Sequence, residues 1–303
     1  MRAVDLFAGL GGFTEGARRA GVQVVAAVNH WPLAIAAHTQ AHPEVKHVLE
    51  DVFSADPRDM PAHDILLASP ACQGHSRARG VERPHHDALR STAWAVRDFA
   101  RVCTPRWVIV ENVPEFVDWQ EFGSWLAAMV ALGYRHSRGV LNAANTGIPQ
   151  DRARVVVVFD RLRQPDMPLL RAQPHRAVRH ILEDSCTARW TQVERPGRSQ
   201  ATLDRVKSGR ERFGRTFVMP YYGGGSGLTG RSLDRPLGTV TTRARWAIVE
   251  GERMRMLTPR ECARVQGFRD SYPLLGTIAE QHHLIGNAIP PPLAAYAIRE
   301  VLS

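Results

Sequence analysis

The sequence predicts an α/β protein with a doubly wound, mostly parallel sheet and a smaller basic domain inserted into it. Three observations support this prediction. Between residues 1 and 160, short apolar runs alternate with amphipathic stretches, a pattern typical of a parallel sheet with helices on both faces. The first apolar run leads directly into a glycine-rich loop, residues 9–12 (GLGG), which is followed by a helical pattern. After residue 160 the alternation stops and an arginine-rich segment begins.

Five short apolar runs, each bounded by glycine, proline or polar residues, are the expected strands of the sheet. They cover Ala3–Phe7, Val22–Val28, Asp64–Ala68, Trp107–Glu111 and Arg154–Phe159. Four amphipathic stretches between these runs are the expected helices. They cover Phe13–Ala20, Leu33–Ala41, Ser91–Val102 and Phe122–Leu132.

The segment from residue 161 to 250 is rich in proline, glycine and arginine and shows no sustained periodicity. Residues 258–261 (TPRE) then have the form of a capping box with proline at the first helical position. A last helix is expected to follow residues 290–292 (PPP) and to end at Leu302. We therefore expect one domain formed by residues 1–160 and 251–303, and a second domain formed by residues 161–250.

The positive charge of the chain is confined to one segment. The 303 residues carry a formal net charge of +9. Residues 161–250 hold 17 basic and 8 acidic residues, whereas the remaining 213 residues hold 22 of each. Because guanidinium groups bind phosphates bidentately, an arginine-rich basic segment indicates a polyanionic partner. A GC-rich genome would explain why only two of the 39 basic residues are lysines, but not why the charge is segregated.

Several other classes of protein are disfavoured. No apolar run approaches the roughly 18–20 residues needed to span a bilayer, and the N-terminus has no signal-peptide pattern. The four cysteines, Cys72, Cys103, Cys186 and Cys262, are widely spaced and form no C-x-x-C pair for a metal or a redox disulfide. We therefore expect a cytoplasmic, reduced protein without a metal.

The glycine loop is the first candidate functional motif. Glycines let a ligand approach the backbone closely, and the N-terminus of the following helix offers free N–H groups. The spacing is G-x-G-G rather than the G-x-G-x-x-G of pyrophosphate-binding loops. Asn29 and His30 follow the second strand, where dinucleotide sites prefer an acidic residue. On its own the loop is also consistent with a tight turn.

Three further motifs lie at the ends of expected strands. Cys72, in residues 69–76 (SPACQGHS), is a candidate thiolate nucleophile, although a lone cysteine is more often a small buried side chain. Glu111 is a candidate acid or base, with a turn cap as the alternative. Arg152 and Arg154 are expected to share one face of a strand, because strand side chains alternate. Such a pair suits an anion or a carboxylate, and a solvated edge strand is the alternative.

The order of these motifs is more specific than any one of them, and it resembles the DNA cytosine-5 methyltransferase family. The motifs are the glycine loop, Pro-x-Cys-Gln at 70–73, Glu-Asn-Val at 111–113, Gln-x-Arg-x-Arg at 150–154, RPLGTVTT at 235–242, RMLTPRECARVQG at 255–267 and GNAIP at 286–290. The resemblance covers nearly the whole chain outside residues 161–230. It implies a Rossmann-like methyltransferase fold in which the basic insertion recognises the target.

The resemblance implies S-adenosylmethionine as the methyl donor. Phe7 would lie against the adenine, Gly9 and Gly11 would take the amino-acid end, and Asp51 would bind the adenine amino group. The implied cofactor residues are Phe7, Gly9, Leu10, Gly11, Asn29, His30, Asp51, Val52, Pro70, Asn287 and Ala288.

The resemblance also implies covalent catalysis on cytosine. Cys72 would add to carbon 6, Glu111 would hold a proton at ring nitrogen 3, Arg154 would bind the exocyclic oxygen, and Arg152 would order the site. Because that face of the base is buried in a duplex, the nucleotide would be flipped out of the helix. The residues implied to contact DNA are Gln73, Ser76, Asn112, Arg243 and Arg245.

The chain departs from the family pattern at two places. Ala71 replaces the proline that usually precedes the nucleophile, and Asn29, followed by His30, replaces the ribose-binding glutamate. The second change leaves open an S-adenosylmethionine analogue as donor. The other hypotheses are a tRNA cytosine-5 methyltransferase, which the size of the basic insertion disfavours, an inactive DNA-binding relative, and a dinucleotide oxidoreductase. We expect a bacterial or phage enzyme of the restriction–modification type that acts on duplex DNA as a monomer.

Overall fold

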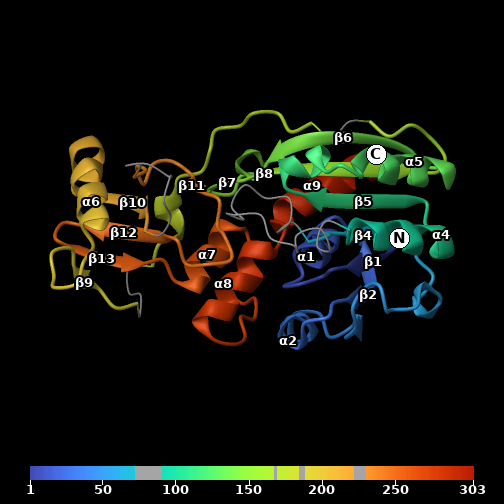
Figure 1. The fold of residues 1–303 in the computed structure, drawn as a ribbon, viewed down its shortest axis with the longest axis horizontal. Helices are drawn as coiled ribbons and strands as arrows, with labels where there is room; N and C mark the ends of the chain where they lie inside the picture. The colour runs from blue at the N-terminus through green and yellow to red at the C-terminus, as the bar shows by residue number, and fades with distance from the viewer. Residues whose placement is uncertain (72–90, 167–168, 184–187, 222–229) are drawn as a thin grey trace. The chain divides into compact units, whose positions relative to one another are not determined.

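The computed structural model describes residues 1–71, 91–166, 169–183, 188–221 and 230–303. The chain divides into two compact units (Figure 1). The first unit consists of Met1–Thr146, Ala153–Ala172 and Asn287–Ser303. The second unit consists of Gly147–Arg152 and Gln173–Gly286. No helix in the described ranges is long and apolar enough to cross a membrane.

The first unit is built around a seven-stranded sheet. Its strands are β1 (Arg2–Leu6), β2 (Gln23–Val28), β3 (Lys46–Val48), β4 (Ile65–Ala68), β5 (Trp107–Asn112), β6 (Arg135–Asn142) and β8 (Ala153–Asp160). Their order across the sheet is β3-β2-β1-β4-β5-β8-β6. The pairs from β3 to β5 are parallel, whereas β8 is antiparallel to both of its neighbours. The predicted doubly wound, mostly parallel sheet is therefore confirmed.

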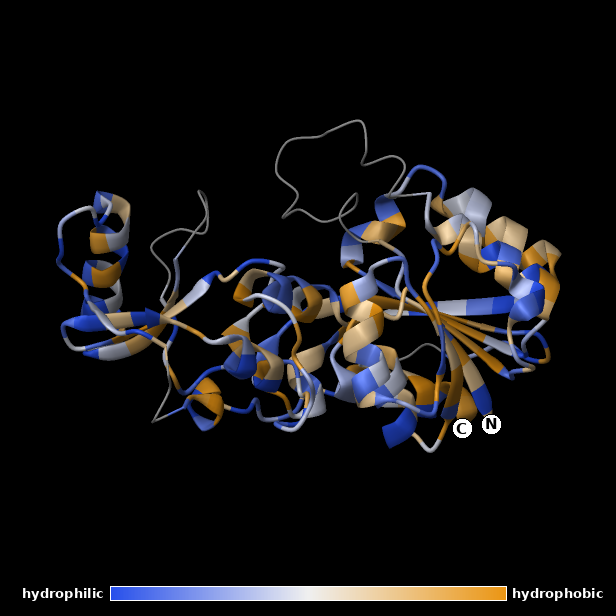
Figure 2. Cartoon of the chain, turned by 90° about the horizontal axis from the view of Figure 1, so that it is seen from below, coloured by the Kyte–Doolittle hydropathy of each residue, from blue (hydrophilic) through white to orange (hydrophobic). Residues whose placement is uncertain are grey.

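The helices of the first unit lie on both faces of this sheet (Figure 1). They are α1 (Gly12–Arg19), α2 (Pro32–Ala41), α4 (Ala93–Cys103), α5 (Phe122–Ala131) and α9 (Pro291–Leu302), with short 3₁₀ helices at Pro57–Asp59, Pro114–Asp118 and Ala143–Thr146. Val96, Phe99 and Trp125 of α4 and α5 pack on alternate strand residues such as Leu6 and Val110. Figure 2 shows largely hydrophobic strands in the sheet and helices of mixed hydropathy beside them.

Helices α1 and α9 pack unusually closely because α1 carries a glycine at the contact. A Cβ atom placed on Gly16 would lie 2.4 Å from the Cβ of Ala294. No such pair of carbon atoms is tolerated, so only glycine allows this approach. The contact holds the C-terminal helix, almost 280 residues later in the chain, against the helix that follows the glycine loop.

All the expected strands and helices of the first unit are present to within one or two residues, but two strands were not predicted. Strand β6 (RHSRGVLN) is mostly polar and partly exposed, as expected for a strand at the edge of a sheet, and so it lacks an apolar run. Strand β3 is only three residues long. The prediction from apolar runs therefore detected the buried strands and missed the two edges.

The second unit contains regular structure where the sequence showed no periodicity. A four-stranded antiparallel sheet has the order β10-β12-β13-β9, and a two-stranded sheet pairs β11 with β7. The strands are β7 (Gln150–Asp151), β9 (Thr191–Gln192), β10 (Thr216–Pro220), β11 (Leu237–Gly238), β12 (Trp246–Glu250) and β13 (Arg253–Met256). The helices are α6 (Gln200–Phe213), α7 (Pro259–Val265) and α8 (Ile278–Asn287), with a 3₁₀ turn at Val178–Ile181. These strands have two to five residues, too few to establish a period.

The bounds of the two units differ from the expected division at residues 161 and 250. Residues 161–172 belong to the first unit, and residues 251–286 belong to the second. Hydrogen bonds explain the second difference, because Gln150 bonds to both Val240 and Gln266 and so ties α7 to the basic segment. The charge remains segregated under the observed division. The second unit holds 20 basic and 12 acidic residues, and the first holds 19 and 18.

The predicted capping box at the start of α7 is confirmed, and it includes a buried ion pair. The Thr258 side chain accepts from the backbone N–H of Glu261, and the Glu261 carboxylate accepts from the backbone N–H of Thr258. Arg255 of β13 binds the same carboxylate bidentately, with both N–O distances at 2.8 Å. Burial alone would raise the pKa of Glu261, but hydrogen bonds from Arg255, Glu183 and Thr258 lower it.

We expect Glu261→Ala to lower the free energy of unfolding by about 3–5 kcal/mol, because it leaves the buried charge of Arg255 without its partner. A matched control is Glu250→Ala, since Glu250 pairs with Arg253 but both side chains are half exposed. That pair should contribute at most about 1 kcal/mol. Denaturant unfolding monitored by circular dichroism measures both, and equal losses would contradict the prediction. Because the pKa of Glu261 is lowered, its contribution should be present at neutral pH and lost as the pH falls through that pKa.

Candidate active site at the carboxyl edge of the sheet

The candidate catalytic and cofactor residues of the first unit follow neighbouring strands. β1, β4 and β5 are adjacent and parallel, so their carboxyl ends meet at one edge of the sheet. The first carries Phe7, the second Ser69 and Pro70, and the third ends at Glu111 and Asn112. Between β1 and β4 the strand order reverses, which is where doubly wound sheets bind ligands.

The glycine loop has a backbone that other residues rarely adopt. Gly9 and Gly11 have φ values of 53° and 92°, and Gly11 is the N-cap residue of α1. Phe7, with φ at 61°, is one of only two non-glycine residues with positive φ among those that the structure describes. Such strain is stored preferentially at functional sites. The loop thus turns sharply from β1 into α1 and leaves Phe7 partly exposed at the end of the strand.

A distant segment reaches the start of α1. A Cβ atom on Gly12 would lie 2.2 Å from the carbonyl oxygen of Ile289, so the backbone of the GNAIP segment touches the end of the glycine loop. Asn287, just before this contact, is exposed, and Ala288 is buried. The structure therefore brings these two expected cofactor residues to the loop formed 275 residues earlier.

The other expected cofactor residues lie at the ends of β2 and β3. The side-chain oxygen of Asn29 accepts from the backbone N–H of Trp31 at 2.9 Å, so it caps the turn that begins α2, while His30 is exposed. Asp51 is exposed and accepts from the backbone N–H of Phe53, and Val52 is buried. Leu10 is fully buried. Asn29, the residue in place of the family's ribose-binding glutamate, thus bonds to the turn before α2, and the neighbouring His30 side chain is exposed.

This arrangement fits a nucleoside-type methyl donor. The glycine positions have no side chain that would block the loop, and the first turn of α1 points its N–H groups toward it. Phe7 offers an aromatic ring at the strand end, and Asp51 offers an exposed acceptor. Among the described residues no group of three or more His, Cys, Asp or Glu side chains could hold a metal ion.

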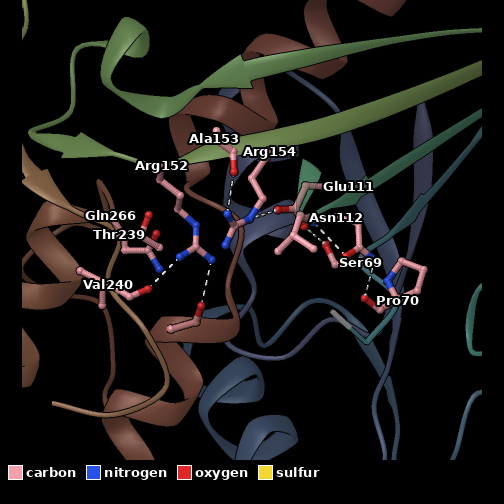
Figure 3. A network of polar contacts seen from close by, with 12 residues as sticks. Ser69, Pro70, Glu111, Asn112, Arg152, Ala153, Arg154, Thr239, Val240 and Gln266 are labelled. Atoms are coloured by element: carbon pink, nitrogen blue, oxygen red, sulfur yellow. Dashed lines mark hydrogen bonds and ion pairs between the residues drawn. The ribbon is translucent and has the colours of Figure 1, made fainter. Parts of the chain in front are cut away.

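Glu111 is the centre of a buried polar cluster in the first unit (Figure 3). Glu111 is 4% exposed. One oxygen lies 2.9 Å from Nε of Arg154, and the other accepts from the hydroxyl of Ser69 at 3.0 Å. Arg154 also donates to the carbonyl of Ala153 at 2.7 Å. The cluster holds a carboxyl group in one orientation at the end of β5, where it can hold or deliver a proton.

The chain that leads into Cys72 is tied to the same cluster. The amide of Asn112 donates to the carbonyl of Pro70 at 3.1 Å, and the backbone N–H of Ala71 donates to the hydroxyl of Thr92 at 3.0 Å. Cys72 itself, with Gln73 and Ser76, lies outside the described residues. The two residues before the expected nucleophile are nevertheless anchored next to Glu111.

Arg152 and Arg154 have different hydrogen-bond partners, each within its own unit. Arg152 falls between β7 and β8, so the extended run is interrupted there. Within the second unit it is 2% exposed and donates to the carbonyls of Val240 and Gly286 at 2.8 and 2.9 Å. Arg154 belongs to the first unit, where it pairs with Glu111. Arg152 thus binds backbone carbonyls of the second unit, and Arg154 pairs with the Glu111 carboxylate in the first.

The two arginines expected to contact DNA lie between β11 and β12 of the second unit. Arg243 is exposed, and Arg245 is partly exposed. The hydroxyl of Thr241 donates to the carbonyl of Arg243, and the backbone N–H of Tyr221 donates to that of Arg245. These backbone bonds hold the loop and leave the side chain of Arg243 in solvent.

Two polar residues of this site were not predicted. Ser69 orients Glu111, and Thr92 holds Ala71, although neither stood out as a functional residue in the sequence. Serine and threonine are common in turns and at helix starts, so their local sequence carries no signal for partners 42 and 21 positions away.

The chain matches known proteins over its full length. The model of the family described as C-5 cytosine-specific DNA methylase matches residues 1–303. The chain is 31% identical to the type II methyltransferase M.AplI of Arthrospira platensis, over 98% of this chain and 84% of that protein. It is 28% identical to M.HhaI of Haemophilus parahaemolyticus, over 95% and 90% of the two chains.

Solved structures share the same fold at lower identity. A Spodoptera frugiperda DNMT2 variant matches with a TM-score of 0.74 and 15% identity, covering 100% of this chain and 99% of that one. The S. pombe Dnmt2 methyltransferase matches with a TM-score of 0.69 and 17% identity, covering 100% and 98%. With the family model matched from the first to the last residue, the chain belongs to the C-5 cytosine-specific DNA methylase family and is a DNA (cytosine-5-)-methyltransferase.

Proposed function

We propose that this enzyme methylates carbon 5 of cytosine in duplex DNA, with S-adenosylmethionine as donor and a covalent adduct on Cys72. The observation that carries the proposal is the Ser69–Glu111–Arg154 cluster beside the anchored residues Pro70 and Ala71. Carbon 5 of cytosine is a poor nucleophile, so the ring must be activated before it can accept a methyl group. A thiolate and a held proton on opposite parts of the ring supply that activation.

In the proposed reaction the Cys72 thiolate adds to carbon 6 of a flipped-out cytosine. Glu111 holds a proton at ring nitrogen 3, so that negative charge does not build up on the ring, and Arg154 donates to the exocyclic oxygen. S-adenosylmethionine supplies the methyl group as a cationic sulfonium donor. Loss of the carbon 5 proton and release of Cys72 then restore the aromatic ring. Arg152 contributes by fixing the backbone of its own unit.

The proposed division of labour gives the first unit the chemistry and the second unit target recognition. Its support is the charge distribution, because the second unit carries nearly the whole positive excess. Flipping a base costs a few kcal/mol, and phosphate contacts by arginines can offset it.

The direct test compares duplex DNA with tRNA as methyl acceptor, using isotope-labelled S-adenosylmethionine and mass spectrometry of the nucleosides. We expect labelled 5-methylcytosine in DNA and none above background in tRNA. Methyl transfer to tRNA alone would show that the substrate is tRNA and not DNA. A modified base of another mass would show that the donor is an analogue of S-adenosylmethionine. Bisulfite sequencing of DNA from expressing cells would report the sequence context.

Arg243→Gln should weaken DNA binding and lower the slope of log affinity against log salt by about 1, because one phosphate contact is lost. The matched control is Arg171→Gln, which removes an equally exposed arginine from the first unit. Fluorescence anisotropy between 50 and 200 mM salt measures both, with S-adenosylmethionine affinity measured alongside. An unchanged slope in Arg243→Gln, or an equal change in Arg171→Gln, would contradict the proposed division.

A further inference from the structure

A chain of four polar side chains leads from beneath the glycine loop to the edge of the sheet, and the reaction above does not use it. Asp5 of β1 accepts from the hydroxyl of Thr14 on α1 at 2.7 Å. The same hydroxyl lies 3.0 Å from Nε2 of His38 on α2. Nδ1 of His38 lies 2.8 Å from Nε2 of His47 on β3. Asp5 and His38 are buried, at 1% and 0% exposure, whereas His47 is partly exposed.

Asp5 sits at the N-terminus of α1 and acts as its cap. Gly11, the N-cap residue, has no side chain, and Asp5 accepts instead from both the hydroxyl and the backbone N–H of Thr14. The positive end of the helix dipole favours an ionised carboxyl group at this place. Asp5 is also two residues before Phe7 on β1, and through Thr14 it is bonded to the first turn of the helix whose N-cap residue is Gly11 of the glycine loop.

The hydrogen bonds that join Asp5, Thr14, His38 and His47 can all point in either of two directions. The direction depends on whether Asp5 is ionised or protonated. When Asp5 is ionised, Thr14 donates to Asp5, His38 donates to Thr14 through Nε2, and His47 donates to His38 through Nε2. When Asp5 is protonated, it donates to Thr14, which donates to Nε2 of His38, and His38 donates to His47 through Nδ1. Both arrangements satisfy every group between Asp5 and His47 with neutral histidines.

The surroundings place the change between these two states near neutral pH. Burial raises the pKa of Asp5 to about 7, against the lowering effect of the bonds from Thr14. Burial, together with the neighbouring His42 and His47, lowers the pKa of His38 well below its usual range, so that ring stays neutral. Burial also lowers the pKa of His47, while Glu44 and a hydrogen bond to the backbone of Val45 act in the opposite direction.

We propose that Asp5, Thr14, His38 and His47 form a proton relay through which Asp5 ionises, and that ionised Asp5 is a positioning residue favouring the cationic donor over its neutral-sulfur product. The inference rests on the proposed use of S-adenosylmethionine. In the relay, Asp5 passes its proton to Thr14 as Thr14 passes its own to Nε2 of His38. At the same time His38 releases the Nδ1 proton to Nε2 of His47, and His47 gives up its hydrogen bond to the backbone of Val45 and releases its other ring proton to solvent. One proton thus leaves Asp5 and one reaches solvent.

The relay has a signature in the protein alone, without any ligand. The ¹⁵N NMR signals of His38 should exchange between the Nδ1–H and Nε2–H tautomers as the pH rises through 7, without passing through the imidazolium. Asp5→Asn should abolish this exchange. Thr14→Ser should keep the tautomer exchange of His38, because serine retains the hydroxyl. Thr14→Val, which has no hydroxyl, should lose it. His136, a partly exposed histidine on β6 whose pKa is also lowered by burial, serves as the control and should titrate identically in all variants.

The role toward the donor is measured by calorimetry. S-adenosylmethionine should bind about tenfold more tightly at pH 8 than at pH 6, because the ionised fraction of a group with a pKa of about 7 rises about tenfold over that range. S-adenosylhomocysteine, which lacks the sulfonium charge, should change less than twofold. The difference should vanish in Asp5→Asn and persist in His136→Gln.

The outcomes separate this inference from the proposed function. If S-adenosylmethionine binds at neither pH, the proposed donor is wrong, and so is the positioning role of Asp5 that depends on it. If it binds equally at both pH values, or if S-adenosylhomocysteine shows the same dependence, the electrostatic role of Asp5 is wrong although the donor stands. A single tautomer of His38 across this pH range would show that the four residues form a static structural network and not a relay.

Discussion

Cys72→Ala is expected to abolish covalent capture of duplex DNA that contains 5-fluorocytosine, and to lower methyl transfer by at least about 10³-fold. Release of Cys72 requires a proton to leave carbon 5, and fluorine at that position cannot leave as a cation. The adduct should therefore accumulate in the native enzyme. Alanine keeps a small apolar side chain after the anchored residues Pro70 and Ala71, but it removes the sulfur proposed to attack carbon 6.

A second cysteine offers a matched control. Cys103 is half buried, its thiol donates to the carbonyl of Pro57, and burial raises its pKa to about 11. It should therefore stay protonated and inert at neutral pH. Cys103→Ala should form the adduct in native yield, as seen by denaturing electrophoresis and intact-mass spectrometry. Equal adduct from Cys72→Ala would refute the covalent mechanism, and loss in both variants would indicate a folding defect.

Glu111→Gln should lower methyl transfer by about 10²- to 10⁴-fold, the usual contribution of a positioned acid or base. Glutamine has almost the same shape and can still accept from Ser69, but it cannot hold a transferable proton, and it leaves Arg154 without a counter-charge. The loss should fall on the chemical step, so single-turnover kinetics with bound DNA is the informative measurement. DNA binding and the affinity for S-adenosylmethionine should change little.

Two variants bracket this result. Ser69→Ala removes one hydrogen bond to Glu111 while the charge stays, and it should lower the rate by no more than about tenfold, equivalent to about 1.4 kcal/mol. Glu115→Gln makes the same chemical change four residues later, at a partly exposed position, and should leave the rate unchanged. If Glu111→Gln were as active as Glu115→Gln, Glu111 would have a structural role only.

Local sequence patterns determined the buried elements with good accuracy because burial itself creates the pattern. β4 and β5 are covered on both faces, so they appear as apolar runs, and β1 does so apart from Asp5; all three end at the observed residues to within one position. The capping box of α7 was readable for a similar reason, since both of its bonds join residues three positions apart. The exposed edge strand β6 and the two-residue strands had no such local signal.

The direction of β8 also could not be predicted from the local sequence pattern. A buried apolar run looks the same in a parallel and an antiparallel strand, and only the pairing of β8 with β5 and β6 shows that it runs opposite to them. The break between β7 and β8 at Arg152 could not be predicted from local sequence either. The side chain of Arg152 donates to backbone carbonyls 88 and 134 positions later in the chain.

The sequence by itself determined the α/β class, the segregation of positive charge and the order of motifs that indicated the family, because these depend on residue types and their spacing. Only the tertiary structure decided what each functional group does. It buried Asp5 and so raised its pKa to about 7, it gave Glu111 its partners Ser69 and Arg154, and it paired Arg152 with the carbonyls of Val240 and Gly286. The physical reason is that charge state and hydrogen bonding depend on the solvent and atoms around a group. Those surroundings are supplied by residues far away in the chain.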